Sequence, residues 1–170
     1  AAAFCLMSSH VHWALCSLGN PLADFLHPLN TAFGQWWNRR HAGFGRVFAE
    51  RPTSIVVDAA EDLARLIAYI HNNPVRAGIV ADPSESDWTS HRAFLGLANP
   101  PPWLDVNWAL AAAGFSATPA GRAGFHDYVV SRSVTPRDPL IAGRGSVAPD
   151  VPARLIRAVA VHTGIGEASI

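Results

Sequence analysis

Two short apolar runs near the start of the sequence, separated by a pair of serines, indicate an antiparallel hairpin. Residues 3–7 and residues 10–17 each have the length and apolar content of a strand, and Ser8-Ser9 can form the turn between them. Side chains alternate between the two faces of a strand, so His10 and His12 lie on one face of the second strand. The other face carries Val11, Trp13 and Leu15. We expect this apolar face to pack on helices.

The rest of the chain is mostly of helical period, interrupted by one short β-branched run. We expect the first helix to be capped by Asn20, to begin at Pro21 and to kink or break at Pro28. Asp58 and Glu61 resemble a capping box for the next helix. We expect helices over residues 21–37, 58–73, 88–95, 104–113, 119–131 and 152–162, a strand over residues 54–57 and a linker over residues 133–149.

The helix predicted over residues 58–73 carries an apolar stripe and, beside it, two polar groups. The stripe consists of Leu63, Leu66, Ile67 and Ile70, which predicts burial of one helix face. Tyr69 and Asn73 are four residues apart, so they are neighbours on the side of that helix that flanks the stripe. Pro74 ends the helix near Asn73.

Composition fits one domain in a reduced compartment. The chain has 170 residues, of which 49% are hydrophobic, and no apolar run is long enough to span a membrane. Its two cysteines lack a metal or redox spacing and no signal peptide is visible, so we expect a cytoplasmic protein. The net charge is zero, but all 13 basic residues are arginine, which binds phosphate as a bidentate fork. A GC-rich genome explains most of that bias.

Four side chains together suggest metal-assisted chemistry on phosphate. His10 and His12 can reach one divalent ion from one strand face, although this spacing alone is weak and does not select a metal. Tyr69 is one of only two tyrosines and can attack phosphorus if its proton is removed. Asn73 can add an amide oxygen as a third ligand. The alternative is that Tyr69 is an ordinary boundary residue and Asn73 an ordinary residue at a helix end.

Basic and aromatic residues provide candidate contacts to nucleic acid. The densest basic cluster comprises Arg39, Arg40, Arg46 and Arg51, and Arg76 follows Tyr69 closely. These five arginines are candidate phosphate contacts, with a solvated surface as the alternative for the cluster. Tryptophans can stack on bases. Trp36 and Trp37, however, lie on an apolar helical stripe, which favours core packing there.

Several segments, in order, resemble the REP-associated tyrosine transposases, which are single-tyrosine members of the HUH endonuclease superfamily. Residues 4–12 (FCLMSSHVH) are similar to the family signature Cys-Leu-Met-Pro-Asn-His-Val-His. The other segments that resemble family blocks are residues 38–41 (NRRH), 69–78 (YIHNNPVRAG), 88–96 (WTSHRAFLG) and 102–105 (PWLD). The resemblance covers roughly residues 3–130.

The resemblance implies an α+β fold with a ferredoxin-like HUH core and cleavage of single-stranded DNA folded as hairpins. Tyr69 would be the nucleophile and would form a 5′-phosphotyrosine. His10, His12 and Asn73 would hold a divalent metal such as Mg²⁺ or Mn²⁺. The implied protein is bacterial, does not bind membranes and is a monomer or homodimer. Residues 1–131 would form the HUH domain and residues 132–150 a linker.

The sequence departs from the family at two places near its start. Ser8-Ser9 replaces Pro-Asn, which alters the turn but removes no catalytic group. Family members begin with a further strand and helix ahead of Phe4, so we expect a sheet without its first strand and an open edge beside the hairpin. Residues 151–170, in particular 153–165, are similar to the beginning of the helix-turn-helix that ends bacterial replication initiators.

Three functions remain in competition at this point. The favoured one is a transposase that nicks hairpin DNA and transfers strands. The second is a protein derived from such a transposase that binds hairpin DNA without cutting it. The third is an unrelated metal hydrolase that uses His10 and His12 with a bound water and tolerates the loss of Tyr69.

Overall fold

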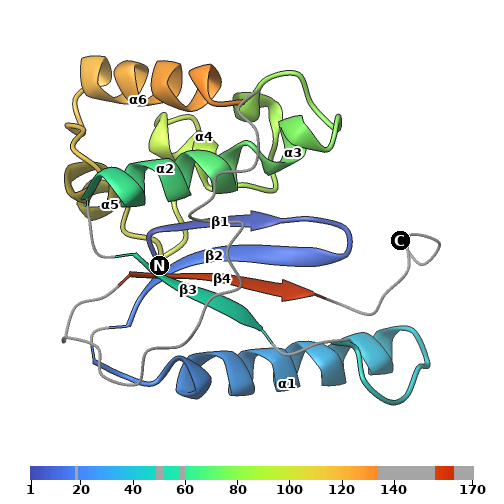
Figure 1. Cartoon of the computed structure of the whole chain (residues 1–170). Coiled ribbons are helices and arrows are strands. Elements are labelled where there is room, and N and C mark those ends of the chain that lie inside the picture. The colour runs from blue at the N-terminus through green and yellow to red at the C-terminus, as the bar shows by residue number, and fades with distance from the viewer. Residues whose placement is uncertain (18, 49–51, 58–59, 134–155, 163–170) are drawn as a thin grey trace.

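The computed structural model describes residues 1–17, 19–48, 52–57, 60–133 and 156–162. A sheet with α1 on one face and α2 to α6 on the other forms the fold (Figure 1). The strands are β1 (Ala3–Leu6), β2 (His10–Cys16), β3 (Thr53–Val57) and β4 (Ile156–His162). The helices are α1 (Leu22–Arg40), α2 (Ala60–His71), α3 (Asn73–Arg76), α4 (His91–Phe94), α5 (Val106–Ala112) and α6 (Pro119–Ser131), with a 3₁₀ turn, η1 (Pro83–Glu85). The α+β class is therefore confirmed.

The sheet has four strands in the order β1-β2-β4-β3, and every neighbouring pair is antiparallel. The hairpin of β1 and β2 agrees with the sequence prediction within one residue at each end. Its register pairs Cys5 with His12. Strand β3 also lies where the β-branched run predicted it.

The helix predicted over residues 152–162 is wrong, because residues 156–162 form β4. This strand pairs with β2 along one side and with β3 along the other. Its sequence, IRAVAVH, holds three β-branched residues, and a short apolar run of this kind fits a buried strand as well as a helix. Pairing on both sides satisfies its backbone groups, which local periodicity cannot anticipate. The rest of the predicted helix-turn-helix segment lies outside the described residues.

The expected open edge beside the hairpin is also absent from the described part of the chain. Strand β4 covers the free side of β2. The outer side of β1 is covered by the segment around Thr89, which forms a bridge with Cys5. The Leu6 amide donates to the Trp88 carbonyl at 2.8 Å, and the Ser90 amide donates to the Phe4 carbonyl at 3.0 Å.

The core lies between the sheet and α2, where the predicted apolar stripe is buried. Leu63, Leu66, Ile67 and Ile70 are each at most 1% exposed, which confirms the stripe. Burial of each such side chain contributes roughly 1.5–3 kcal/mol. Phe94 of α4 and Phe125 of α6 stack at 5.1 Å between ring centroids and complete this core. Helices α5 and α6 lie within the predicted ranges, and α4 forms only part of the range 88–95. The capping box at Asp58 lies outside the described residues.

Helix α1 differs from the expectation in three respects. It begins at Leu22 with Pro21 as N-cap and without a side-chain cap, and it continues through Pro28. Leu26 is its one buried residue, and it packs with Leu15 of β2. Trp36 is 53% exposed, so the prediction that it packs in the core is wrong. The apolar face of β2 does pack on α1, as predicted. None of the described helices is long and apolar enough to cross a membrane.

Candidate active site

The histidine face of β2 meets the last turn of α2. The rings of His10 and His12 lie nearly perpendicular, with 4.8 Å between their centroids. The ring of His12 in turn meets the ring of Tyr69 edge-on, with a centroid distance of 5.7 Å and an interplanar angle of 89°. Strand alternation directs both imidazoles toward α2, and the buried stripe fixes the rotation of α2 that turns Tyr69 toward them. The sequence thus predicted three side chains that the fold brings together.

Arg76 completes this cluster from the short helix α3. Its guanidinium carbon lies 4.8 Å from the centroid of the Tyr69 ring. Helix α2 ends at His71, earlier than predicted, and α3 starts at Asn73 with Pro74 in its first turn. Arg76 follows Tyr69 by seven residues, about two helical turns, which places its side chain on the same side as the Tyr69 ring. A permanent cation beside the phenol suits a site for a phosphate group.

Asn73 is held by the end of α2. Its side-chain nitrogen donates to the carbonyls of Tyr69 at 3.1 Å and Ile70 at 3.2 Å. These two bonds orient the amide and leave its oxygen as the atom that can bind a ligand. Within the described residues, that oxygen accepts no hydrogen bond.

The residues present fit a divalent metal only in part. Across the described chain, no group of three or more His, Cys, Asp or Glu side chains can hold an ion. His10 and His12 supply two imidazoles, and the Asn73 oxygen is a candidate third donor. Mg²⁺ and Mn²⁺ commonly keep several waters and take phosphate oxygens from the substrate as further ligands. The two imidazoles therefore supply part of a coordination shell, and a bound metal would take its further ligands from water, a substrate phosphate and, where it reaches, the Asn73 oxygen.

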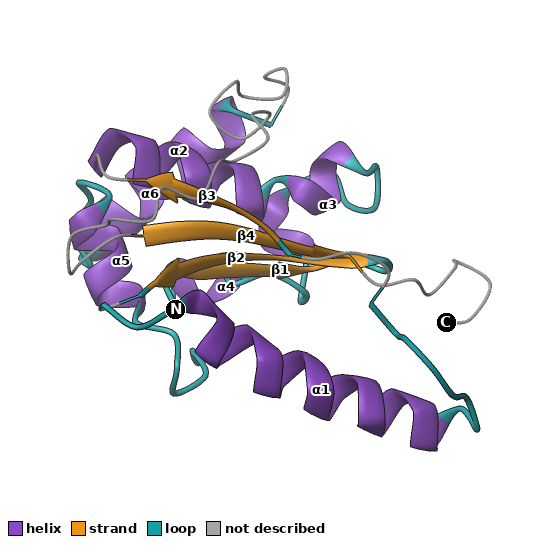
Figure 2. Cartoon of the chain, turned by 60° about the horizontal axis from the view of Figure 1, so that its bottom comes forward, coloured by secondary structure: helices purple, strands orange, loops and turns teal. Residues whose placement is uncertain are grey.

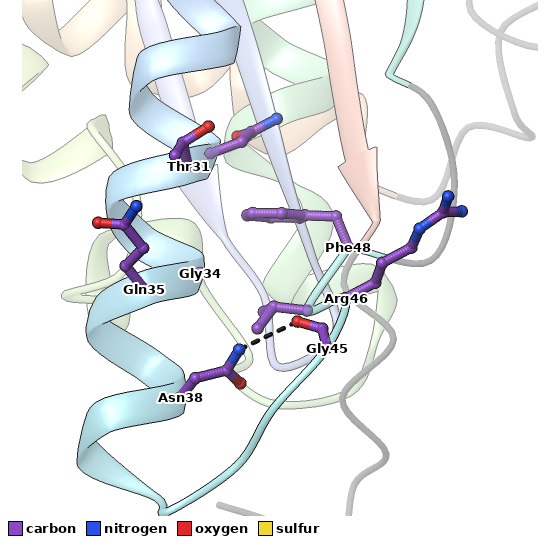
Figure 3. Close-up of a pocket in the computed structure, with 9 residues that line it drawn as sticks. Thr31, Gly34, Gln35, Asn38, Gly45, Arg46 and Phe48 are labelled. Atoms are coloured by element: carbon purple, nitrogen blue, oxygen red, sulfur yellow. Dashed lines mark hydrogen bonds between the residues drawn. The ribbon is translucent and has the colours of Figure 1, made fainter.

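The other predicted arginines do not join this cluster. Arg39 and Arg40 are exposed at the end of α1, across the sheet from Tyr69 (Figures 1 and 2). Arg46 lines a pocket of about 340 Å³ between α1 and the following loop, together with Phe48 (Figure 3). The Asn38 side chain also lines this pocket and donates to the Gly45 carbonyl at 3.0 Å. Arg51 lies outside the described residues.

Two other nucleophilic groups are set apart from the cluster. Cys5 is the strand neighbour of His12, but burial raises the pKa of its thiol to about 12. Tyr128 of α6 resembles Tyr69, since Arg132 lies over its ring at 4.5 Å. The aromatic ring contacts of Tyr128 among the described residues are to Phe115 rather than to an imidazole.

A chain of three histidines, of which His71 and His91 are buried, lies next to the candidate site and was not predicted. His91 Nδ1 lies 3.0 Å from His71 Nδ1, and His91 Nε2 lies 3.0 Å from His126 Nδ1. The inner end of the chain is His71 Nε2, 2.7 Å from Ser90 Oγ. The outer end is His126 Nε2, 3.7 Å from the Asp82 carboxylate. Both His71 and His91 occur in segments that resemble family blocks, but only the fold shows that they touch.

This histidine chain predicts loss of stability in acid. Burial, and then the neighbouring His91, lowers the pKa of His71 well below its ordinary value. Burial, and then His126, lowers the pKa of His91 to about 3, against the opposing effect of Asp82. Below about pH 6.5 the unfolded chain therefore binds protons that the folded chain does not. Each of the two histidines should remove roughly 1.4 kcal/mol of unfolding free energy per pH unit as the pH falls from 6.5 toward its folded pKa.

Urea unfolding between about pH 7 and pH 5 measures this slope. His91→Gln should reduce the slope, because one proton-linked site is lost. His27→Gln is the matched control, because it makes the same substitution at a histidine that is exposed on α1. An unfolding free energy that stays constant over this pH range would contradict the statement that His71 and His91 are buried in the neutral form.

Comparison with known proteins does not identify a family for this chain. No protein-family model, no curated protein and no solved structure matches it. The functional argument therefore rests on the side chains described above.

Proposed function

We propose that this protein is a tyrosine transposase of the REP-associated type, which nicks and rejoins single-stranded hairpin DNA. The observation that carries the proposal is the contact of Tyr69 with His12 at 5.7 Å, with Arg76 over the same ring at 4.8 Å. A phenol between an imidazole pair and a guanidinium has the groups that phosphoryl transfer requires in one place.

The reaction transfers the phosphoryl group of one phosphodiester from its 3′-oxygen to the oxygen of Tyr69. The Tyr69 oxygen forms a bond to phosphorus, the bond from phosphorus to the 3′-oxygen breaks, and the phenol proton leaves to solvent. The 3′-oxygen takes up a proton, and the 5′ end stays attached to the protein. Reversal by a 3′-hydroxyl restores the diester, so no external energy is needed. A bound divalent metal would supply charge neutralisation at the phosphate, held by His10, His12 and the Asn73 oxygen.

The strand arrangement supports a ferredoxin-like HUH core. Strands β2 and β3 are both antiparallel to β4, so they run parallel to each other with β4 between them. Helix α1 lies between β2 and β3 in sequence, which gives a split βαβ unit. In this arrangement the hairpin lies at one side of the sheet and presents its histidines to α2.

Exposed arginine and tryptophan side chains at one end of the molecule support the proposal that the partner is DNA. The β1–β2 turn, α3 and the C-terminal end of α1 all lie at the right-hand end in Figure 1. Arg39 and Arg40 are exposed there, beside Trp36, which is 53% exposed. Arginine side chains and an exposed indole suit the backbone and the bases of a single strand, respectively.

The proposal is tested by incubating the protein with hairpin DNA labelled on either side of the cleavage site, with Mg²⁺ or Mn²⁺. We expect a denaturation-resistant adduct that carries the label of the 5′ end of the downstream fragment. Cleavage without an adduct would support a hydrolase that uses an activated water, and binding without cleavage would support a non-catalytic DNA-binding protein. Either result contradicts the proposal.

Two substitutions at Asn73 test whether this residue is a metal ligand or only an ordinary residue at a helix end. Asn73→Ala removes both the oxygen and the donor to the Tyr69 and Ile70 carbonyls. We expect about a tenfold higher metal concentration for half-maximal adduct formation, by analogy with the loss of metal-site partners. Asn73→Asp keeps an oxygen and loses the donor, so it should retain the metal affinity. Equal metal dependence of the two variants would remove Asn73 from the ligand set.

A further inference from the structure

We infer that Ser90 and His71 are positioning residues that hold the Tyr69 helix at a fixed distance from the histidine strand. This inference rests on the proposed function for its kinetic consequence, whereas its geometry is independent of it. The two side chains join α2 to β1 through one hydroxyl. Neither of them is in the cluster that contacts Tyr69.

The bridge consists of three contacts to the Ser90 hydroxyl. His71 Nε2 lies 2.7 Å from Ser90 Oγ. The Phe4 amide donates to the same oxygen at 3.0 Å, and the hydroxyl faces the Phe4 carbonyl at 3.3 Å. Both His71 and Ser90 are at most 1% exposed, so water does not compete for these bonds.

The ends of this bridge lie close in sequence to the reactive groups. His71 follows Tyr69 by two residues in the last turn of α2. Phe4 precedes Cys5, the residue that pairs with His12 across the hairpin. The bridge therefore ties the backbone that carries the nucleophile to the strand pair that carries the imidazoles. These hydrogen bonds constrain the relative position of α2 and β1 in addition to apolar packing, because their strength depends on both distance and angle.

The histidine chain fixes the His71 ring through its Nδ1 atom, on the side away from Ser90. A hydroxyl has one proton, so when Ser90 donates to the Phe4 carbonyl, His71 must donate through Nε2. The Nδ1 atom of His71 then accepts from His91, and His91 Nε2 accepts from His126. Each N···N contact holds one proton, so the donor roles of His71 and His91 are coupled to each other and to the ring beyond them. This coupling holds the His71 ring against rotation, in addition to the ring contact with Phe94 at 4.9 Å.

The test uses Ser90→Ala and reads both the position of Tyr69 and the rate. With only two tyrosines in the chain, fluorotyrosine labelling gives two ¹⁹F resonances, which Tyr69→Phe and Tyr128→Phe assign. We expect Ser90→Ala to shift or broaden the Tyr69 resonance and to leave the Tyr128 resonance unchanged. The rate constant for adduct formation should fall about 10–100-fold, with DNA affinity and KM within about twofold, since a displacement on the order of 1 Å has this cost.

Ser86→Ala is the matched control. Ser86 is a buried serine in the same loop, 5% exposed, and its hydroxyl accepts from the Trp88 amide at 3.3 Å. Within the described residues it makes no hydrogen bond to α2. Ser86→Ala and Ser90→Ala should both lower the melting temperature. Ser86→Ala should neither shift the Tyr69 resonance nor change the rate constant for adduct formation. Ser90→Thr keeps the hydroxyl and should restore both. If Ser90→Ala does not fold, Ser90→Cys fills the same space with a weaker hydrogen-bonding group and should give a smaller change of the same sign.

The two proposals fail in different ways. If the wild-type protein forms no adduct, the proposed function is wrong, and the ¹⁹F spectrum alone then decides the bridge. A Tyr69 resonance that moves no more in Ser90→Ala and Ser90→Cys than in Ser86→Ala would overturn the bridge. An adduct rate that stays unchanged while the Tyr69 resonance moves would show that the bridge does not position the reactive groups.

Discussion

Replacing Tyr69 by phenylalanine should reduce covalent attachment to hairpin DNA by about three orders of magnitude or more, the scale seen when an enzyme loses its nucleophile. The change keeps the ring that packs against His12 and the core. It removes only the hydroxyl, for which the described structure shows no hydrogen bond. We therefore expect the melting temperature and the DNA affinity to stay close to those of the wild type. Gel analysis of labelled DNA after denaturation measures the adduct, and a filter or anisotropy assay measures the affinity.

Tyr128→Phe is the matched control for this change. Tyr128 is also half-buried and also has an arginine over its ring, at 4.5 Å, but its ring packs on Phe115. It should form the adduct at the wild-type rate. An adduct that survives in Tyr69→Phe and disappears in Tyr128→Phe would transfer the nucleophile to α6.

The second large effect is expected from the imidazole pair. His10→Ala and His12→Ala should each lower metal-dependent cleavage by more than the 10–100-fold that loss of an outer partner of a metal site costs. Binding of hairpin DNA should survive, because contacts to phosphate dominate the affinity for nucleic acid. The variants are compared with the wild type over a range of Mn²⁺ concentrations, with cleavage and binding measured on the same preparations.

His27→Ala controls for the general loss of an imidazole. His27 is exposed on α1, where its Nδ1 lies 3.4 Å from Thr31 Oγ1. It should leave cleavage and binding unchanged. A parallel loss of cleavage and binding in His12→Ala would indicate misfolding rather than loss of a ligand, and full cleavage in both histidine variants would exclude the metal role.

The elements that local pattern determines were predicted well. The hairpin follows from alternation and a polar turn, and α2 follows from an apolar stripe of helical period. Each of these elements buries one face, so the spacing of its apolar residues in the sequence matches the face that is buried in the structure. The meeting of His12 with Tyr69 follows from these two faces, which explains why most of the cluster was found from the sequence.

Elements that depend on distant partners were not predicted. The segment 156–162 is a strand because β2 and β3 pair with both of its sides, and neither partner is near it in sequence. Helix α1 has a long apolar stripe but buries only Leu26, which packs with Leu15 of β2. Helix α2 ends at His71, two residues before Asn73, which was the end that Pro74 suggested.

The histidine chain likewise could not be predicted from local sequence, because it depends on side chains that are distant in the sequence. His71, His91 and His126 come from three different helices, and none has a spacing that marks it as part of a network. A buried histidine is visible in a sequence only as a polar residue on an apolar face. Its partner becomes visible once the helices are packed.

The most direct measurement is to locate the nucleotide on the protein by mass spectrometry of the trapped adduct. Cleavage after arginine releases residues 66–76 as one peptide, in which Tyr69 is the only tyrosine, and residues 123–132 as another, which holds Tyr128. We predict that the nucleotide mass is found on Tyr69 in the first peptide. A nucleotide on the second peptide, or complete cleavage of the DNA with neither peptide modified, would contradict the assignment of Tyr69 as the nucleophile.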